Sequence, residues 1–340
     1  MKKLLLIVMC LFLVSCATGN TNNNQDNDVI NNNDNTILEP PPVVYQSKFD
    51  GRELENNEPN DARIFAVMFD NAPGARPQAG LSKAKIVYEI RIESVATRFM
   101  GIFEHTENVT IGGVRSARPY FVATVAEYGA IYAHHGADAS VLALIPEYGV
   151  ENVSGMYYDG STYQRQSHKV APHNSYTTLD ALNERADQLG YSETNHFNGF
   201  TFYEDTQAIG GTPATTVSLT YGNVYGATYN YDETLKTYAR MNHNVEHVDE
   251  TTGEVIQATN IIIHLSDYHT AANGVHKEFN LVGQGQAILI SHGEQVNLNW
   301  SKATISAPTI YTREDGQEFK LNPGQTWIQW IETNGSFQVS

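Results

Sequence analysis

The chain has 340 residues, a formal net charge of −17 and only two cysteines, Cys10 and Cys16. This length allows two domains, and the acidic balance without a basic run excludes a general nucleic-acid-binding surface. Both cysteines lie near the N-terminus, so the rest of the chain offers no thiol for catalysis, zinc binding or a disulfide. Any anion-binding site must be built by local clustering of cations within an acidic protein.

The first 16 residues have the features of a bacterial lipoprotein signal. Lys2 and Lys3 precede an apolar stretch from Leu4 to Val14, and the small Ser15 stands before Cys16. This stretch is shorter than the ~20 residues that a transmembrane helix needs. We therefore predict that Cys16 carries a lipid such as palmitate after cleavage of the signal peptide. The lipid would anchor the protein to the extracytoplasmic face of the cell membrane.

Residues 17–59 are predicted to form a disordered tether. Asn, Asp, Thr and Gly dominate from Ala17 to Asn35, and Glu39 is followed by three prolines. So few apolar side chains do not offset the entropy lost when a chain folds, and the prolines favour an extended conformation. The tether would hold the folded part away from the membrane.

Residues 60–205 are predicted to form a mixed domain of strands and helices. β-rich apolar runs indicate strands at Ile64–Phe69, Ile86–Glu93 and Phe99–Phe103. Helical patterns cover Arg118–Tyr128, Ala139–Tyr148 and Leu179–Leu189. In the second strand, alternation places Ile86, Tyr88 and Ile90 on the core face and Glu89, Arg91 and Glu93 on a charged face.

Residues 206–340 are predicted to form a small antiparallel all-β domain, which makes the whole chain α+β. Short β-rich runs separated by Gly, Asp and Asn turns replace the helical signals: Ala214–Tyr221, Tyr225–Tyr231, Thr237–Met241, Asn260–Leu265, Gln286–Ser291, Gln295–Trp300 and Gln325–Ile331. Trp327 and Trp330 are three residues apart in one strand and hence on opposite faces. In a simple sandwich at most one of them is in the core, and the other is an exposed contact.

The candidate ligand-binding residues are arginines beside turns in the first domain, with nearby histidines. These residues are Arg76, Arg98, Arg115, Arg118, His134, His173 and Asn174. Arginine forks bind carboxylate or phosphate groups with two parallel hydrogen bonds. The alternative is that these arginines form structural ion pairs with Asp70, Glu89 and Glu93.

Catalytic constellations are weak in this sequence. No HExxH spacing or G-x-S-x-G elbow occurs, adjacent His134 and His135 would face opposite ways on a strand, and we predict no metal and no other cofactor. Cleavage of a glycan needs a carboxyl group as general acid or base, for which Glu93, Glu89 and Asp70 are candidates. Glu89 and Glu93 would lie ~13 Å apart on a strand, so one of them would act alone or with Asp70.

Several runs in the chain resemble the YerB-like lipoproteins, a bacterial family of unknown function. In the first part these runs are Val67–Asn71, Ala75–Leu81, Val87–Glu89, Thr97–Phe99, Gly113–Pro119 and Ala171–Asn174, and in the second part Asn297–Lys302 and Leu321–Ile328. The resemblance implies a two-domain, membrane-tethered envelope protein, and it implies no reaction. Ser94-Val95 stands where the family has a Gly pair, and Asp138 stands where it has Ser.

Two function classes follow from the sequence. The first is a lipoprotein whose Arg/His-lined cleft binds an anionic envelope ligand, such as a peptidoglycan carboxylate, a teichoic-type phosphate or an acidic segment of a protein partner. The second is a cell-wall glycan-cleaving enzyme with Glu93 or Glu89 as general acid or base. We favour the first class because no known catalytic spacing is present.

Overall fold

The computed structural model describes residues 44–54, 61–93, 95–222, 224–271, 274 and 276–340. The predicted lipobox at Cys16 and most of the predicted tether lie outside these residues. Among the described residues, no helix is long and apolar enough to cross a membrane. The positions from Val43 onward cluster as one unit.

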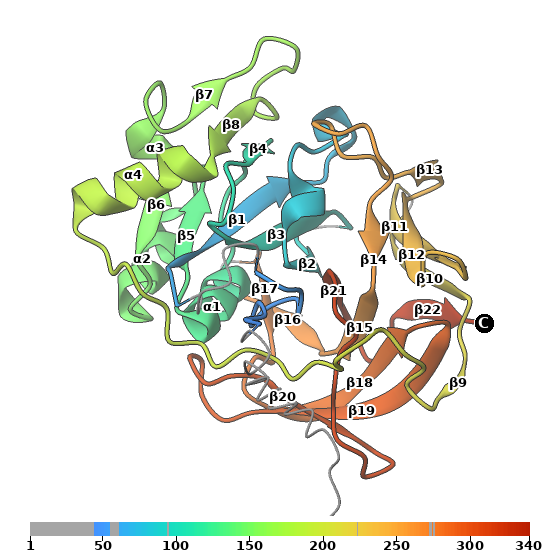
Figure 1. Cartoon of the computed structure of the whole chain (residues 1–340). Coiled ribbons are helices and arrows are strands. Elements are labelled where there is room, and N and C mark those ends of the chain that lie inside the picture. Colours follow the sequence, from blue (N-terminus) through green and yellow to red (C-terminus); the bar gives the residue numbers. More distant parts are fainter. Residues whose placement is uncertain (1–43, 55–60, 94, 223, 272–273, 275) are drawn as a thin grey trace, which may run out of the picture. The chain divides into compact units, whose positions relative to one another are not determined.

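The largest element of the fold is an 11-stranded sheet (Figure 1). Its strands, in spatial order, are β20 (Ile310–Arg313), β19 (Glu294–Lys302), β18 (Gly283–Ser291), β15 (Asn260–Leu265), β21 (Thr326–Ile331), β2 (Ile86–Arg91), β3 (Thr97–Glu104), β1 (Ile64–Asp70), β5 (Ile131–His134) and β6 (Asn152–Ser154), with β9 (Thr212–Pro213) beside β19. Strands from both halves of the chain therefore share one sheet.

Six strands of this sheet run in the same direction. β2, β21 and β15 pair in parallel, and so do β1, β5 and β6. β3 is antiparallel to both β1 and β2, which gives the two groups a common direction. The carboxyl ends of all six strands thus lie at one edge, the place where parallel sheets commonly bind ligands.

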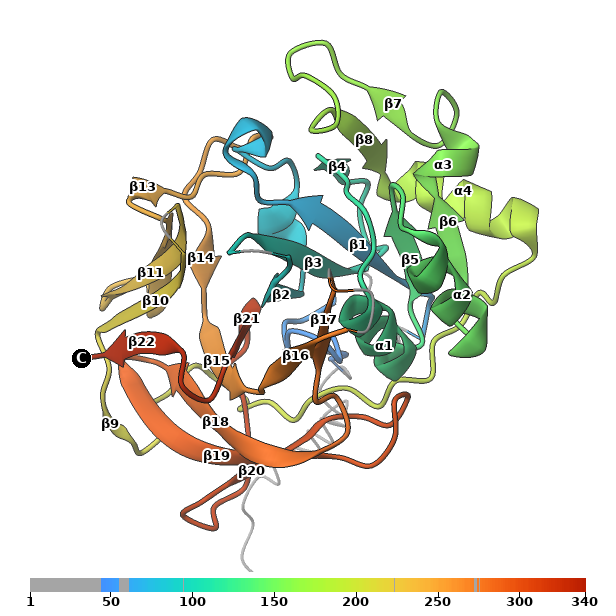
Figure 2. The same ribbon diagram turned by 180° about the vertical axis from the view of Figure 1, so that it is seen from behind.

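Helices lie against the part of this sheet around β5 (Figure 2). They are α1 (Pro119–Tyr128), α2 (Ala139–Glu147), α3 (Gly155–Tyr158) and α4 (Leu179–Leu189), with short 3₁₀ turns at Pro73–Ala75 and Leu81–Lys83. α1 begins with Pro119, whose missing N–H is no loss at a first helical position, and ends at Gly129 in a left-handed conformation. Its buried side chains join Ile86, Tyr88 and Ile90 in one core.

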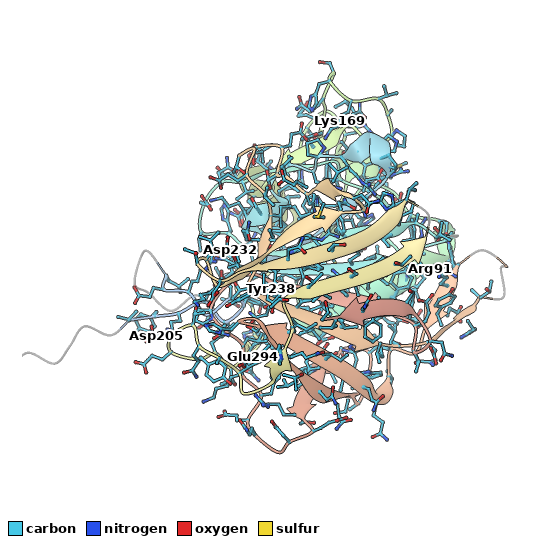
Figure 3. All side chains as sticks on the ribbon, turned by 90° about the vertical axis from the view of Figure 1, so that its right-hand side faces the viewer. Arg91, Lys169, Asp205, Asp232, Tyr238 and Glu294 are labelled. Atoms are coloured by element: carbon cyan, nitrogen blue, oxygen red, sulfur yellow. The ribbon has the colours of Figure 1, made fainter. Side chains whose placement is uncertain are left out.

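A second, six-stranded sheet covers the other face of β2 and β3. It contains β13 (Val245–Glu246), β12 (Thr237–Asn242), β11 (Tyr225–Asp232), β10 (Thr216–Gly222) and β22 (Ser336–Val339), with β14 (Gln257–Ala258) beside β12. Figure 3 shows Tyr238 on this sheet and Glu294 on the main sheet. The Tyr238 hydroxyl joins the two, because it accepts a hydrogen bond from Gly293 N at 2.9 Å and donates one to Ala214 O.

Two small sheets complete the fold. β16 (Tyr268–Thr270) pairs with β17 (Lys277–Phe279), and β4 (Thr110–Gly112), β8 (Ser175–Thr178) and β7 (Gln164–Arg165) form a three-stranded sheet.

The α+β class and the three predicted helices are confirmed. Residues 206–340 contain no helix among those described, as predicted, but their strands do not form a small antiparallel sheet of their own. β21 lies in parallel between β15 and β2, which continues the sheet of the first half. The boundary at residue 205 stays a prediction.

Candidate functional site

Asp70 is the centre of the candidate site. It ends β1 at the edge where the parallel strands terminate, and it is paired in register with Arg98 of β3. Its Oδ2 accepts hydrogen bonds from Arg115 Nε at 2.9 Å and His173 Nδ1 at 2.7 Å, while Oδ1 accepts one from Ala72 N at 3.0 Å. Burial opposes ionisation, but these donors hold the pKa of Asp70 below its ordinary value.

Close backbone packing brings Arg115 and His173 to Asp70. The segment after β4 is anchored by the hydrogen bond from Arg115 N to Met68 O. Gly113 in this segment lies directly against the His173 backbone, and a Cβ at this glycine would stand 2.3 Å from the His173 carbonyl oxygen. Only glycine permits this approach, so Gly113 sets the position of the His173 turn.

Arg98 is a buried cation with an incomplete set of partners. Its residue surface is 5% exposed, and its Nη1 donates to Ser116 O at 2.7 Å. Its Nε is buried and has no hydrogen-bond partner, and no carboxylate of the described residues forms an ion pair with it. Burial, together with the nearby Arg118 and Arg115, lowers the pKa of Arg98 to about 10. A desolvated donor beside two further cations is the environment expected where an anion binds.

Arg118 and Glu93 form the neighbouring ion pair. Arg118 Nε and Nη2 donate to Glu93 Oε1 at 2.5 Å and Oε2 at 2.8 Å. Burial opposes ionisation of Glu93, but Arg118 lowers its pKa. On the other side of Glu93, His276 lies 3.8 Å away and also contacts Asp138 at 2.5 Å. Glu93 is therefore held as an ionised carboxylate, which is unsuited to donating a proton.

Arg76 adjoins this group through Asn71. Its Nε donates to Asn71 O and Oδ1, both at 3.1 Å, and its guanidinium lies 5.6 Å from the centre of the Tyr225 ring. Asn71 also donates to Thr97 at 2.7 Å and Glu89 at 3.4 Å. Arg76 is thus fixed by the loop that follows β1.

The prediction that Glu89 lies on a charged face is wrong. Its side chain is fully buried and pairs with Arg240 Nη2 of β12 at 2.6 Å. Arg240 is equally buried, is hydrogen-bonded to His247 and Tyr229, and lies 4.4 Å from the Trp327 ring centre. The six-stranded sheet covers this face of β2, and Glu89 has no exposed surface with which to contact a ligand.

His134 and Asn174 do not join the group around Asp70 through any contact in the described residues. His134 is buried and has Gly136 O and Asn152 Oδ1 within hydrogen-bond distance, and burial lowers its pKa. Asn174 accepts from Arg165 and donates to Gln166 O. The structure thus gathers Arg98, Arg115 and His173 about Asp70, with Arg118 and Glu93 next to them.

Ser116 and His276 are members of the site that the sequence did not reveal. Ser116 acts through its backbone carbonyl, which carries no side-chain signal. His276 comes from the second half of the chain, 183 residues after Glu93, and no motif marks it. In the described part of the chain, no group of three or more His, Cys, Asp or Glu side chains is arranged to hold a metal ion.

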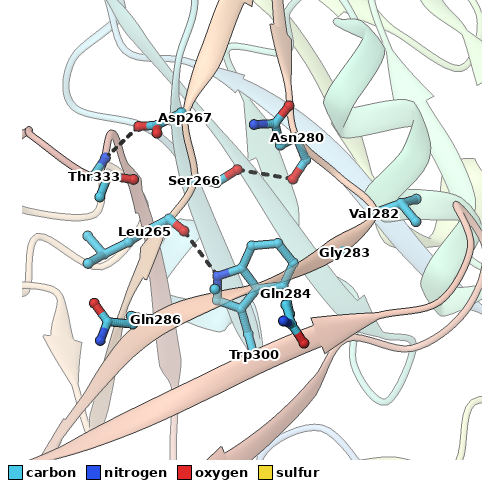
Figure 4. Close-up of a pocket in the computed structure, with 11 residues that line it drawn as sticks. Leu265, Ser266, Asp267, Asn280, Val282, Gly283, Gln284, Gln286, Trp300 and Thr333 are labelled. Carbon is cyan, nitrogen blue, oxygen red and sulfur yellow. Dashed lines mark hydrogen bonds between the residues drawn. The ribbon is translucent and has the colours of Figure 1, made fainter.

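The tryptophans form no exposed aromatic surface. Trp300, Trp327 and Trp330 are all buried, because helices and strands cover both faces of β21. The prediction that at most one of Trp327 and Trp330 is in the core is therefore wrong. Trp300 borders a hollow of about 420 Å³, where its Nε1 donates to Leu265 O at 3.0 Å (Figure 4).

Comparisons with known proteins identify the family of this chain. Residues 50–192 match the N-terminal domain, and residues 217–328 the C-terminal domain, of a family described as "Protein of unknown function (DUF3048)". A relative from Bacillus subtilis (strain 168), named "Putative lipoprotein YerB", is 33% identical over 283 residues, which are 82% of this chain and 84% of that protein.

The fold is also similar to a solved structure. The crystal structure of the YerB protein from Bacillus subtilis superposes with a TM-score of 0.78 at 30% identity, covering 87% of this chain and 99% of that chain. Matches over both family domains, at this identity and coverage, show that the chain belongs to the DUF3048 family of YerB-like proteins.

Proposed function

We propose that this protein is a membrane-anchored envelope lipoprotein that binds an anionic ligand at Arg98 and Arg115. The observation that carries the proposal is the buried Nε of Arg98, which has no partner. A guanidinium removed from water loses hydration free energy unless its donors are satisfied, and an anion would satisfy this one.

The local charge balance favours an anion with a single charge. Arg98, Arg115 and Arg118 carry three positive charges, while Asp70 and Glu93 carry two negative charges. One positive charge is left uncompensated in a protein whose overall charge is −17. A carboxylate of peptidoglycan, a teichoic-type phosphodiester or an acidic side chain of an envelope partner would each balance it.

The location rests on two further observations. The similarity to a Bacillus subtilis protein named as a lipoprotein supports lipid anchoring. The lipobox ending at Cys16 supplies the residue that the lipid would modify. A protein exported with such a signal would meet the polymers of the cell envelope on the extracytoplasmic face.

The alternative, cleavage of a glycan by Glu93 or Glu89, has less support from the geometry. A general acid needs a raised pKa and access to the leaving oxygen. Glu93 has a lowered pKa and is engaged by Arg118, and Glu89 is buried against Arg240.

Co-sedimentation with peptidoglycan sacculi tests the proposal. Full-length protein in detergent should pellet with sacculi that retain their teichoic polymer or their free carboxylates, and Arg98→Gln should reduce the bound fraction at least tenfold. Arg52→Ala removes one positive charge from an exposed position outside the site and serves as the control. Equal binding by all three proteins would refute the proposal. Release of muropeptides, followed by mass spectrometry, would instead support the glycan-cleaving alternative.

A further inference from the structure

His173 and Asp70 have the arrangement of an oriented proton acceptor. The His173 Nδ1 atom lies 2.7 Å from Asp70 Oδ2. An ionised carboxylate only accepts hydrogen bonds, so Nδ1 carries the proton of a neutral imidazole and the lone pair resides on Nε2. No atom of the described residues forms a hydrogen bond with Nε2, and the side chain is 24% exposed.

Three segments fix the orientation of this imidazole. The ring lies over Gly74, where an added Cβ would stand 3.2 Å from its Cδ2 and 3.4 Å from its Nε2. Gly113 packs against the His173 carbonyl, and His173 N donates to Val170 O at 2.9 Å. The ring is therefore held as rigidly as a positioned base requires.

The imidazole stands beside the proposed anion site. Arg115 Nε and His173 Nδ1 donate to the same oxygen of Asp70, at 2.9 Å and 2.7 Å, so these two nitrogens are at most 5.6 Å apart. Arg98 lies close enough to interact electrostatically with both Asp70 and Arg115. An anion held by Arg115 and Arg98 is consequently a neighbour of the His173 ring.

Arginines that hold an anion next to an oriented base are the parts that phosphoryl transfer needs, because that chemistry depends on positioning and on stabilising the charge of the phosphoryl oxygens. The single uncompensated positive charge of the site matches the single charge of a phosphodiester. Resting on the proposed anion site, we propose that the protein hydrolyses a phosphodiester with His173 as the general base and Asp70 as its positioning residue.

The reaction balances with water as the only co-substrate. The water oxygen forms a bond to phosphorus while His173 Nε2 takes one of its protons. The bond between phosphorus and the leaving oxygen breaks, and its electron pair goes to that oxygen. The leaving oxygen then takes the proton from the imidazolium, directly or through water, so the products are an alcohol and a phosphomonoester. Arg98 and Arg115 stabilise the charge on the phosphoryl oxygens during this step.

Hydrolysis of bis(p-nitrophenyl) phosphate by full-length protein in detergent tests the proposal. Its leaving group departs without a proton, so this probe isolates the role of the base. The wild-type protein should release p-nitrophenolate, and His173→Gln should lower the rate about 100-fold or more, the usual contribution of a positioned general base. His196→Gln replaces an exposed histidine elsewhere and should keep the wild-type rate.

Equilibrium dialysis with the same probe separates the two proposals. His173→Gln should still bind the probe, whereas Arg98→Gln should lose both binding and turnover. A wild-type protein that binds the probe without hydrolysing it would overturn the catalytic proposal and leave anion binding intact. A protein that neither binds nor hydrolyses it would overturn both proposals for phosphodiesters. Turnover that survives His173→Gln would overturn the assignment of the base.

Discussion

Two buried arginines should respond in opposite ways to the same substitution. Arg98 has an unpartnered Nε, no carboxylate partner in the described residues and two cationic neighbours. Arg240 is fully buried and paired with the equally buried Glu89 at 2.6 Å. Methionine fills a similar elongated space without a charge, so Arg98→Met and Arg240→Met form a matched pair.

The magnitudes follow from what each substitution leaves behind. Arg98→Met removes a buried unsatisfied donor, whose cost is about 1–3 kcal/mol, and gives up one hydrogen bond worth about 0.5–1.5 kcal/mol. The free energy of unfolding should stay the same or rise by up to about 2 kcal/mol. Arg240→Met leaves the Glu89 carboxylate buried without its cation, which should cost about 3–5 kcal/mol.

Thermal unfolding followed by circular dichroism distinguishes these outcomes. One kcal/mol corresponds to about 2–4 °C in a domain of 150–250 residues, so Arg240→Met should lower Tm by at least about 6 °C. Arg98→Met should keep or raise Tm while it abolishes binding to sacculi. A fall of Tm for Arg98→Met as large as that for Arg240→Met would show that Arg98 is a structural residue, and the argument for a ligand would fail.

Four further predictions follow. Arg115→Ala and Glu93→Gln should each keep Tm within a few degrees of the parent and lose binding to sacculi; low Tm with normal binding of the folded fraction would make the group purely structural. Ionised Asp70 should contribute stability above about pH 3.9, the unfolded-state pKa, and this contribution should vanish as pH falls through its lower folded pKa. Asp70→Asn should therefore flatten the decline of Tm between about pH 4 and pH 2, and an unchanged decline would contradict the ion pairs described. Gly113→Ala should displace the His173 turn and reduce binding, and normal binding would show that this close approach is dispensable. Cys16→Ala should leave an uncleaved precursor without acyl label in labelled cells, and equal labelling of mutant and parent would refute the lipobox.

Local patterns predicted the helices and most strands because neighbouring residues determine them. Apolar runs mark β1, β2 and β3, and α1 lies between Pro119 and Gly129, the residues expected at helix ends. Asp138 caps α2 through hydrogen bonds from Ser140 N and Val141 N, a role that the Ser of related proteins would also fill. The cluster of Asp70, Arg115 and His173 was within reach of sequence reasoning because all three flank turns.

Errors arose where a distant segment decides the environment of a residue. Alternation along β2 placed Glu89 on the solvent side, but its partner Arg240 follows 151 residues later and brings a second sheet with it. The same sheet covers Trp327, so both tryptophans of β21 are buried. His134 was assigned to the site from its place in the sequence, yet its contacts are with Gly136 and Asn152.

The place of β21 between β15 and β2 has a consequence for the export of this protein. β2 emerges early from the membrane, but its parallel neighbour is among the last segments to follow, as the 241 residues between Ala84 and its partner Gln325 indicate. Until then the edge of β2 offers unpaired backbone groups to any other strand, a common route to aggregation. Contacts so far apart in sequence also slow folding. A chain that stalls or is cut before Thr326 would leave that edge open, so envelope proteases and chaperones, rather than the ligand, would decide how much of it survives.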